Sequence, residues 1–158
     1  MDSTAVVAAL GLLTTLAAAG VTAYLQRSSQ RESRVFEARV TGYAALAAAL
    51  YEYERATYNR VKARLEQRSD TERDTYRQEA WASNAKARAA IGVVALLSTS
   101  PNLHAQFDDV RSSIGDLKSA PNEQDLSKSH ESILRALEAA LFKARQELLP
   151  ARGRGHRR

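Results

Sequence analysis

The chain of 158 residues contains no cysteine, which excludes disulfides and thiolate metal sites and agrees with a reducing compartment. Only three prolines and seven glycines interrupt it, and β-branched residues are sparse beyond the first 25 positions. No stretch alternates between apolar and polar residues with a period of two, as a half-buried strand does. These absences predict an all-α protein.

Charged side chains are absent from residues 5–25, whose sequence is AVVAALGLLTTLAAAGVTAYL. A helix of about 20 apolar residues is long enough to cross a bilayer core about 30 Å thick. We therefore predict a transmembrane helix here. Two alternatives are a secretory signal peptide cleaved near residues 17–19, although the basic start typical of such peptides is missing, and a buried core helix.

The charges on either side of residues 5–25 predict an orientation. Asp2 is the only charged side chain before this stretch, whereas basic residues follow it closely, and positive flanks stay in the cytoplasm. We expect residues 1–4 outside the cell, a lipid bilayer as a partner, and the rest of the chain in the cytoplasm. The membrane-flanking basic residues are Arg27, Arg31 and Arg34. Small residues recur along the apolar stretch, so self-association of the helix is a further hypothesis.

Helical spacing and helix-stopping residues divide the remaining chain into four helices, at about 26–66, 71–97, 101–118 and 124–149. Ser69 is expected to cap the second helix, and Ser100 the third, with Pro101 at its first position. We expect the apolar stretch to continue directly into the first of them. Short connections favour antiparallel neighbours, so residues 26–149 are predicted to form an antiparallel four-helix bundle domain. The alternative is a long coiled-coil dimer, but Pro101 and Pro121 limit unbroken pairing to the first helix.

Apolar residues at steps of three and four mark the expected core. The third helix has the cleanest pattern, and in the first helix the stripe starts at Phe36 and Val40. Glu54 interrupts that stripe and is expected either to pair with Arg88 or Arg135 or to reach the surface. In the fourth helix Phe142 is expected to broaden the apolar face.

No pattern of catalytic or metal-binding residues is present. His104, His130 and His156 are the only histidines, and their spacing does not match a zinc or di-iron site, so we expect them to be solvated or at the edge of the core. Glu52 and Glu54 point to different helix faces. Neither a nucleophile elbow nor a glycine-rich phosphate loop occurs. We therefore predict a protein that is not an enzyme and has no cofactor, no metal and no evident small-molecule substrate.

Arginine and tyrosine residues raise the question of a polyanionic partner. Tyrosines interleaved with Arg55, Arg60 and Arg64 could bind nucleic acid by stacking and phosphate contacts, but aromatic residues at helical spacing more often pack in a core. Four of the five net positive charges come from the last residues, which we expect to be disordered over residues 150–158. They could contact anionic lipid headgroups or nucleic acid, or merely solubilise the chain. These tail residues are Arg152, Arg154, Arg157 and Arg158.

The arrangement of a short exterior segment, one span, basic residues and a helical domain resembles that of uncharacterised actinobacterial single-pass membrane proteins. The similar stretches are YLQRSSQRESRVFEARVTGYAALAAALYEY, IGVVALLSTSPNLHAQFDDV and ALFKARQELL. The resemblance implies no activity. We therefore expect a membrane-anchored helical bundle that binds a protein partner or itself. The alternatives are a membrane-tethered nucleic-acid-binding module and a secreted helical protein.

Overall fold

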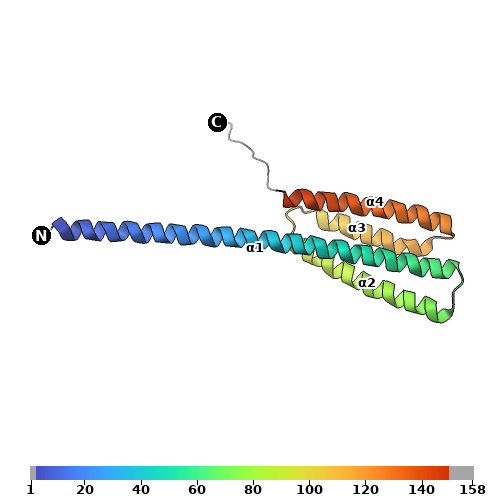
Figure 1. Ribbon diagram of the computed structural model, residues 1–158. Coiled ribbons are helices and arrows are strands. Elements are labelled where there is room, and N and C mark those ends of the chain that lie inside the picture. Colours follow the sequence, from blue (N-terminus) through green and yellow to red (C-terminus); the bar gives the residue numbers. More distant parts are fainter. Residues whose placement is uncertain (1–2, 150–158) are drawn as a thin grey trace, which may run out of the picture. The chain divides into compact units, whose positions relative to one another are not determined.

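The computed structural model of the chain describes the backbone of residues 3–149 and the side chains of residues 30–149 (Figure 1). Four α-helices and one short 3-10 helix follow each other: α1 (Ser3–Leu65), α2 (Asp70–Leu97), α3 (Leu103–Asp116), η1 (Leu117–Ser119) and α4 (Glu123–Leu148). The described residues contain no strand, which confirms the all-α prediction. The chain divides into two compact units, Met1–Glu37 and Ala38–Arg158.

The first unit contains the predicted span and the arginines predicted to flank it. Arg31 and Arg34 are exposed, and the Ser33 hydroxyl donates a hydrogen bond to Glu37 over 3.4 Å. The predicted span at residues 5–25 and the side chain of Arg27 lie outside the residues whose side chains the structure describes. Within the described part of the chain, no helix is both long enough and apolar enough to cross a membrane.

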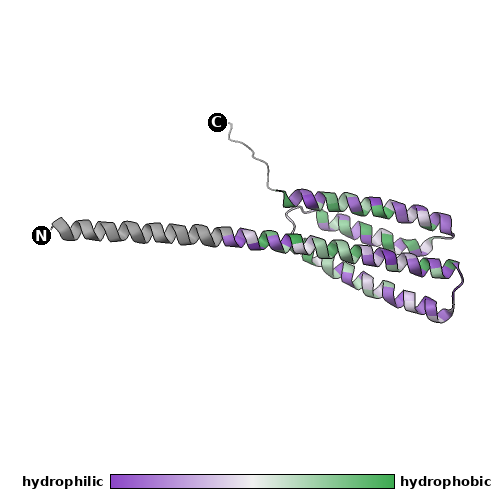
Figure 2. Ribbon diagram, in the orientation of Figure 1, coloured by the Kyte–Doolittle hydropathy of each residue, from purple (hydrophilic) through white to green (hydrophobic). Residues whose placement is uncertain are grey.

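The second unit is a four-helix bundle in which each helix runs antiparallel to the one before it (Figure 1). Hydrophilic residues alternate with hydrophobic ones along every helix of this unit, as expected when one face of each helix is buried (Figure 2). Side chains from α1, α2, α3, η1 and α4 meet in one core cluster, with Leu46, Leu50, Phe107, Ile114 and Leu137 fully buried at its centre. The predicted bundle is confirmed.

The ends of the helices follow from local hydrogen bonds. Ser69 and Glu72 form a reciprocal capping box at the start of α2, and the Asn122 side chain accepts from the Asp125 N–H over 2.8 Å at the start of α4. Each helix begins one residue before its predicted start at about 71 or 124. The prediction that Ser100 caps the third helix is wrong, because α3 begins at Leu103 after a turn and the Ser100 N–H is bound elsewhere.

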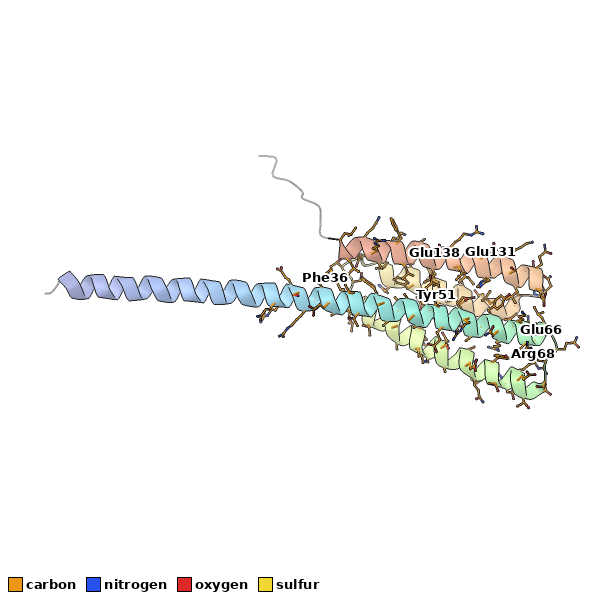
Figure 3. All side chains as sticks on the ribbon, viewed as in Figure 1. Phe36, Tyr51, Glu66, Arg68, Glu131 and Glu138 are labelled. Carbon is orange, nitrogen blue, oxygen red and sulfur yellow. The ribbon has the colours of Figure 1, made fainter. Side chains whose placement is uncertain are left out.

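Most of the predicted core residues are buried, and the exceptions lie near helix ends or on outer faces. The whole stripe of the third helix is buried, which confirms its clean pattern: Leu103, Phe107, Val110, Ile114 and Leu117. Phe36 and Val40 were predicted to be inward, but they are 50% and 40% exposed, and Tyr43 is the first residue of the α1 stripe in the core cluster. The Phe36 side chain is labelled in Figure 3. Phe142 is exposed too, on the outer face of α4.

Candidate functional site

One end of the bundle, here called the proximal end because the second unit begins there, is closed by Glu147 on the last turn of α4. Its carboxylate accepts hydrogen bonds from the Tyr43 hydroxyl at 2.5 Å, the Ser98 hydroxyl at 3.0 Å and the Ser100 N–H at 2.9 Å. Burial raises the pKa of Tyr43, and the adjacent Glu147 carboxylate adds to this shift. One carboxylate therefore joins α1, the α2–α3 connection and α4.

Around this closure, the proximal end exposes apolar side chains. The Arg39 guanidinium donates to the Leu97 carbonyl over 2.7 Å, which fixes the last turn of α2 against α1. Leu96, on that turn, is 87% exposed. Three further apolar side chains at this end, from α1, α2 and the residue that follows α4, are exposed as well: Val40, Val93 and Leu149.

Halfway along the bundle, α1 and α4 are joined by a buried carboxylate and an imidazole. Glu54 is only 5% exposed, and its Oε1 atom lies 2.5 Å from Nδ1 of His130. The Tyr58 ring packs against the imidazole with ring centroids 4.9 Å apart. The pair links α1 to α4. Among the described residues, no group of three potential metal ligands surrounds this pair or any other point.

The expected partners of Glu54 are wrong. Arg135 instead pairs with Glu131 on the outer face of α4 at 3.2 Å, and Arg88 is exposed on α2. The antiparallel register places His130 opposite Glu54, a position that helical spacing within one segment does not reveal. His130 thus matches the expectation of a histidine at the core edge, while His104 is exposed and His156 lies outside the described residues.

The opposite end of the bundle, the distal end, holds a cleft of about 640 Å³ between the C-terminal part of α1, the N-terminal turns of α2 and η1. Its lining contains five cationic side chains and two carboxylates. We call it the basic cleft, and its lining residues are Arg60, Val61, Arg64, Asp70, Arg73, Asp74, Arg77 and Lys118.

The charges of the basic cleft are only partly neutralised. Asp70 pairs with Arg73, and Asp74 pairs with Arg77, each three residues apart on α2. The Arg64 guanidinium donates to the carbonyls of Lys118, at 2.6 Å, and Ala120. Within the described part of the chain, no carboxylate and no hydrogen-bond acceptor binds the side chain of Arg60 or Lys118. A surplus of positive charge therefore remains in the cleft.

Of the membrane-flanking arginines and the tail arginines singled out from the sequence, the structure describes the side chains of two. Arg31 and Arg34 are exposed on α1 in the first unit. Arg27 lies outside the residues whose side chains are described, and so do the tail residues Arg152, Arg154, Arg157 and Arg158. Their predicted contacts with lipid or a polyanion stay predictions.

Sequence reasoning noticed Arg60 and Arg64 but missed the cleft to which they belong. The available signal was the segment RSDTERDTYR, which places an arginine three residues after each of Asp70 and Asp74 on one helix face. Its position opposite Arg60 follows from the antiparallel turn at residues 66–69. No sequence pattern pointed to Glu147, since a glutamate near a helix end is ordinarily solvated.

Comparisons with known proteins give one match. The family model described as KilB plasmid transfer protein matches residues 40–148, which covers the bundle and well over half of the chain. No curated protein and no solved structure matches the chain. The actinobacterial source and the span stay predictions, since the matched residues begin after the predicted span. The match to residues 40–148 places this chain in the KilB plasmid transfer protein family.

Proposed function

We propose that this chain is a membrane-anchored, non-catalytic interaction protein that acts in plasmid transfer. The family match over the whole bundle is the observation that carries the role in transfer. The uncharged stretch at residues 5–25 supports the anchor, and Arg27, Arg31 and Arg34 support a cytoplasmic bundle.

A role in binding is supported by what the side chains of the bundle do. Glu147, Glu54 and His130 are engaged in contacts between helices, so these three polar side chains serve the packing of the bundle. The proximal end, in contrast, leaves Leu96 and its apolar neighbours exposed, and such groups are suited to contact with a partner or a second copy.

Reporter fusions test the anchor and its orientation. A fluorescent protein that matures only in the cytoplasm, fused after Arg158, should fluoresce and sediment with membranes. Leu12→Arg combined with Leu16→Arg should release the fusion from the membrane fraction, because charge in the span opposes insertion. An exterior C-terminus would overturn the orientation, and a mature N-terminus near Gly20 by intact mass would show signal cleavage.

Plasmid transfer itself tests the role. Donor cells that lack this chain should transfer the plasmid less often, and the unmodified gene should restore transfer. Leu96→Glu should restore it poorly if the exposed proximal side chains contact a partner. Trp81→Glu is the matched control, because Trp81 is also strongly exposed on α2 but lies about 20 Å closer to the distal end at 1.5 Å per residue. Full restoration by Leu96→Glu would contradict the assignment of binding to the proximal end.

A further inference from the structure

We propose that the basic cleft at the distal end binds the phosphodiester backbone of double-stranded nucleic acid. From the sequence, a nucleic-acid-binding module was an alternative to the preferred interpretation, and its candidate contacts were Arg55, Arg60 and Arg64 beside tyrosines and the arginines of the tail. The fold gives a reason to revise that interpretation, because it brings cationic side chains of three elements together in one cleft. They are Arg60 and Arg64 of α1, Arg73 and Arg77 of α2, and Lys118 of η1.

The composition of the lining identifies the ligand chemistry. Five cations face two carboxylates, so the cleft carries three net positive charges. Both carboxylates are held by arginines of their own helix, as exposed pairs that contribute little to stability. A polyanion can therefore replace Asp70 and Asp74 as the partner of the Arg73 and Arg77 guanidinium groups, with little loss of stability.

Two side chains of the cleft are ready to bind without breaking a contact. Within the described residues, neither the Arg60 guanidinium nor the Lys118 ammonium has an ion-pair partner, and they lie on different elements of the lining. Arg64 plays another role, because its donors are committed to the carbonyls of Lys118 and Ala120 and it holds η1 in place.

The lining favours a phosphate backbone over exposed bases. No aromatic ring lines the cleft, so no platform exists on which unpaired bases could stack. Double-stranded DNA carries about one negative charge per 1.7 Å of its axis, and cations that neutralise phosphates bind it with little regard to sequence. The cleft thus fits contact with a duplex backbone.

Anionic lipid offers the same phosphate chemistry, and the position of the cleft argues against it. Along α1, Arg64 lies roughly 40 Å from Ala38, where the second unit begins, at 1.5 Å per residue. In the proposed topology the proximal end follows the span in the sequence, and the cleft lies at the other end of the bundle. This step alone rests on the proposed function.

The test measures binding of the full chain, in a nonionic detergent, to a labelled 20-base-pair DNA duplex across a series of salt concentrations. The unmodified chain should bind at low salt, and log K should fall linearly with log salt. Arg60→Gln with Arg77→Gln should weaken binding and reduce that slope by about two, one for each lost phosphate contact. Asp74→Asn should strengthen binding, because it removes a competing carboxylate.

Three controls keep the outcome clear. Arg135→Gln removes a more exposed arginine from the outer face of α4 and should bind as the unmodified chain does. Thermal unfolding should confirm that the Arg60→Gln/Arg77→Gln chain is folded. Vesicles with anionic headgroups distinguish lipid from nucleic acid, and the fusion reporters test the anchor independently. The proposal is overturned if the unmodified chain does not bind the duplex, or if Arg135→Gln weakens binding as much as the cleft substitutions do. It is also overturned if the cleft substitutions weaken binding to vesicles alone. The same holds if duplex binding is weakened only by substitutions in the tail, at Arg152, Arg154, Arg157 and Arg158.

Discussion

The proximal and distal ends of the bundle are built in opposite ways. At the proximal end, the polar groups point inward to the single carboxylate of Glu147, and apolar side chains such as Leu96 face outward. At the distal end, charged side chains face outward around an open cleft, and the ion pairs are short-range, as between Glu66 and Arg68 (Figure 3).

This difference suggests that the proximal end serves stability and the distal end serves binding. Contacts between distant residues through a part-buried carboxylate stabilise the fold, whereas exposed pairs between neighbours contribute little. We therefore expect substitutions at the proximal closure to destabilise the bundle and substitutions at the distal end to alter binding. One chain can then present two chemically different surfaces at a distance set by the length of its helices.

The largest effect is expected at Glu147. Glu147→Ala leaves the Tyr43 hydroxyl, the Ser98 hydroxyl and the Ser100 N–H without their acceptor, which should lower the free energy of unfolding by about 3 kcal/mol. Urea unfolding followed by circular dichroism measures this loss. Glu147→Gln keeps one acceptor oxygen and should lose about half as much. A loss below about 1 kcal/mol for the alanine variant would remove the contrast between the two ends.

Between the two ends, the Glu54–His130 pair is expected to contribute an intermediate amount to the free energy of unfolding. His130→Ala leaves a buried carboxylate without its partner and should lower the free energy of unfolding by about 2 kcal/mol, less than for a fully buried pair because water reaches the imidazole. Replacing both residues by leucine should restore most of the loss, since no buried charge remains. If the double variant were as unstable as the single one, packing rather than charge would explain the effect.

A smaller effect is expected at the distal end. Arg64→Ala removes the donors to the carbonyls of Lys118 and Ala120 and should cost about 1 kcal/mol, because these exposed carbonyls can bind water instead. Arg60→Ala, in the same cleft but without such bonds, should change the free energy of unfolding by less than about 0.5 kcal/mol. Equal losses in Arg64→Ala and Glu147→Ala would contradict the comparison.

The smallest effect concerns pH. Because the pKa of Tyr43 is raised in the folded chain, its contribution to stability is complete below the unfolded pKa of about 10 and is lost as pH rises through the folded pKa. Alkaline titration of tyrosinate absorbance should show a late component that is reduced but not abolished in Tyr43→Phe, because burial raises the pKa of Tyr53 as well. Glu147→Gln should reduce the shift without abolishing it, because burial is its larger cause. A Tyr43 that titrates normally would show that the closure opens.

Local patterns predicted the elements well. The spacing of Leu103, Phe107 and Ile114 predicted the buried face of α3, and Ser69 marked the start of α2, because these signals depend only on residues a few positions apart. The prediction for Ser100 went wrong for a related reason. Its N–H is bound by Glu147, which lies far away in the sequence, and α3 begins later.

Contacts between helices were the part that sequence could not supply. The partner of Glu54, the role of Glu147 and the joining of Arg60 with Arg77 all depend on the register between antiparallel helices. Phe36 and Val40 continue the apolar spacing of α1, but spacing along one helix does not tell where its neighbours end. The candidate site was therefore visible only as separate arginines.

The hydrogen bonds of Glu147 also determine in which connection between helices the chain can accept insertions or deletions. Ser98 and Ser100 bind one carboxylate of α4, so an insertion in the connection at residues 98–102 would shift one donor away from it. The connection at residues 66–69 is bound only to its own neighbours in the sequence, such as Arg68 N–H to the Ala63 carbonyl at 3.0 Å. Homologues should therefore vary in loop length between α1 and α2 and keep it constant between α2 and α3.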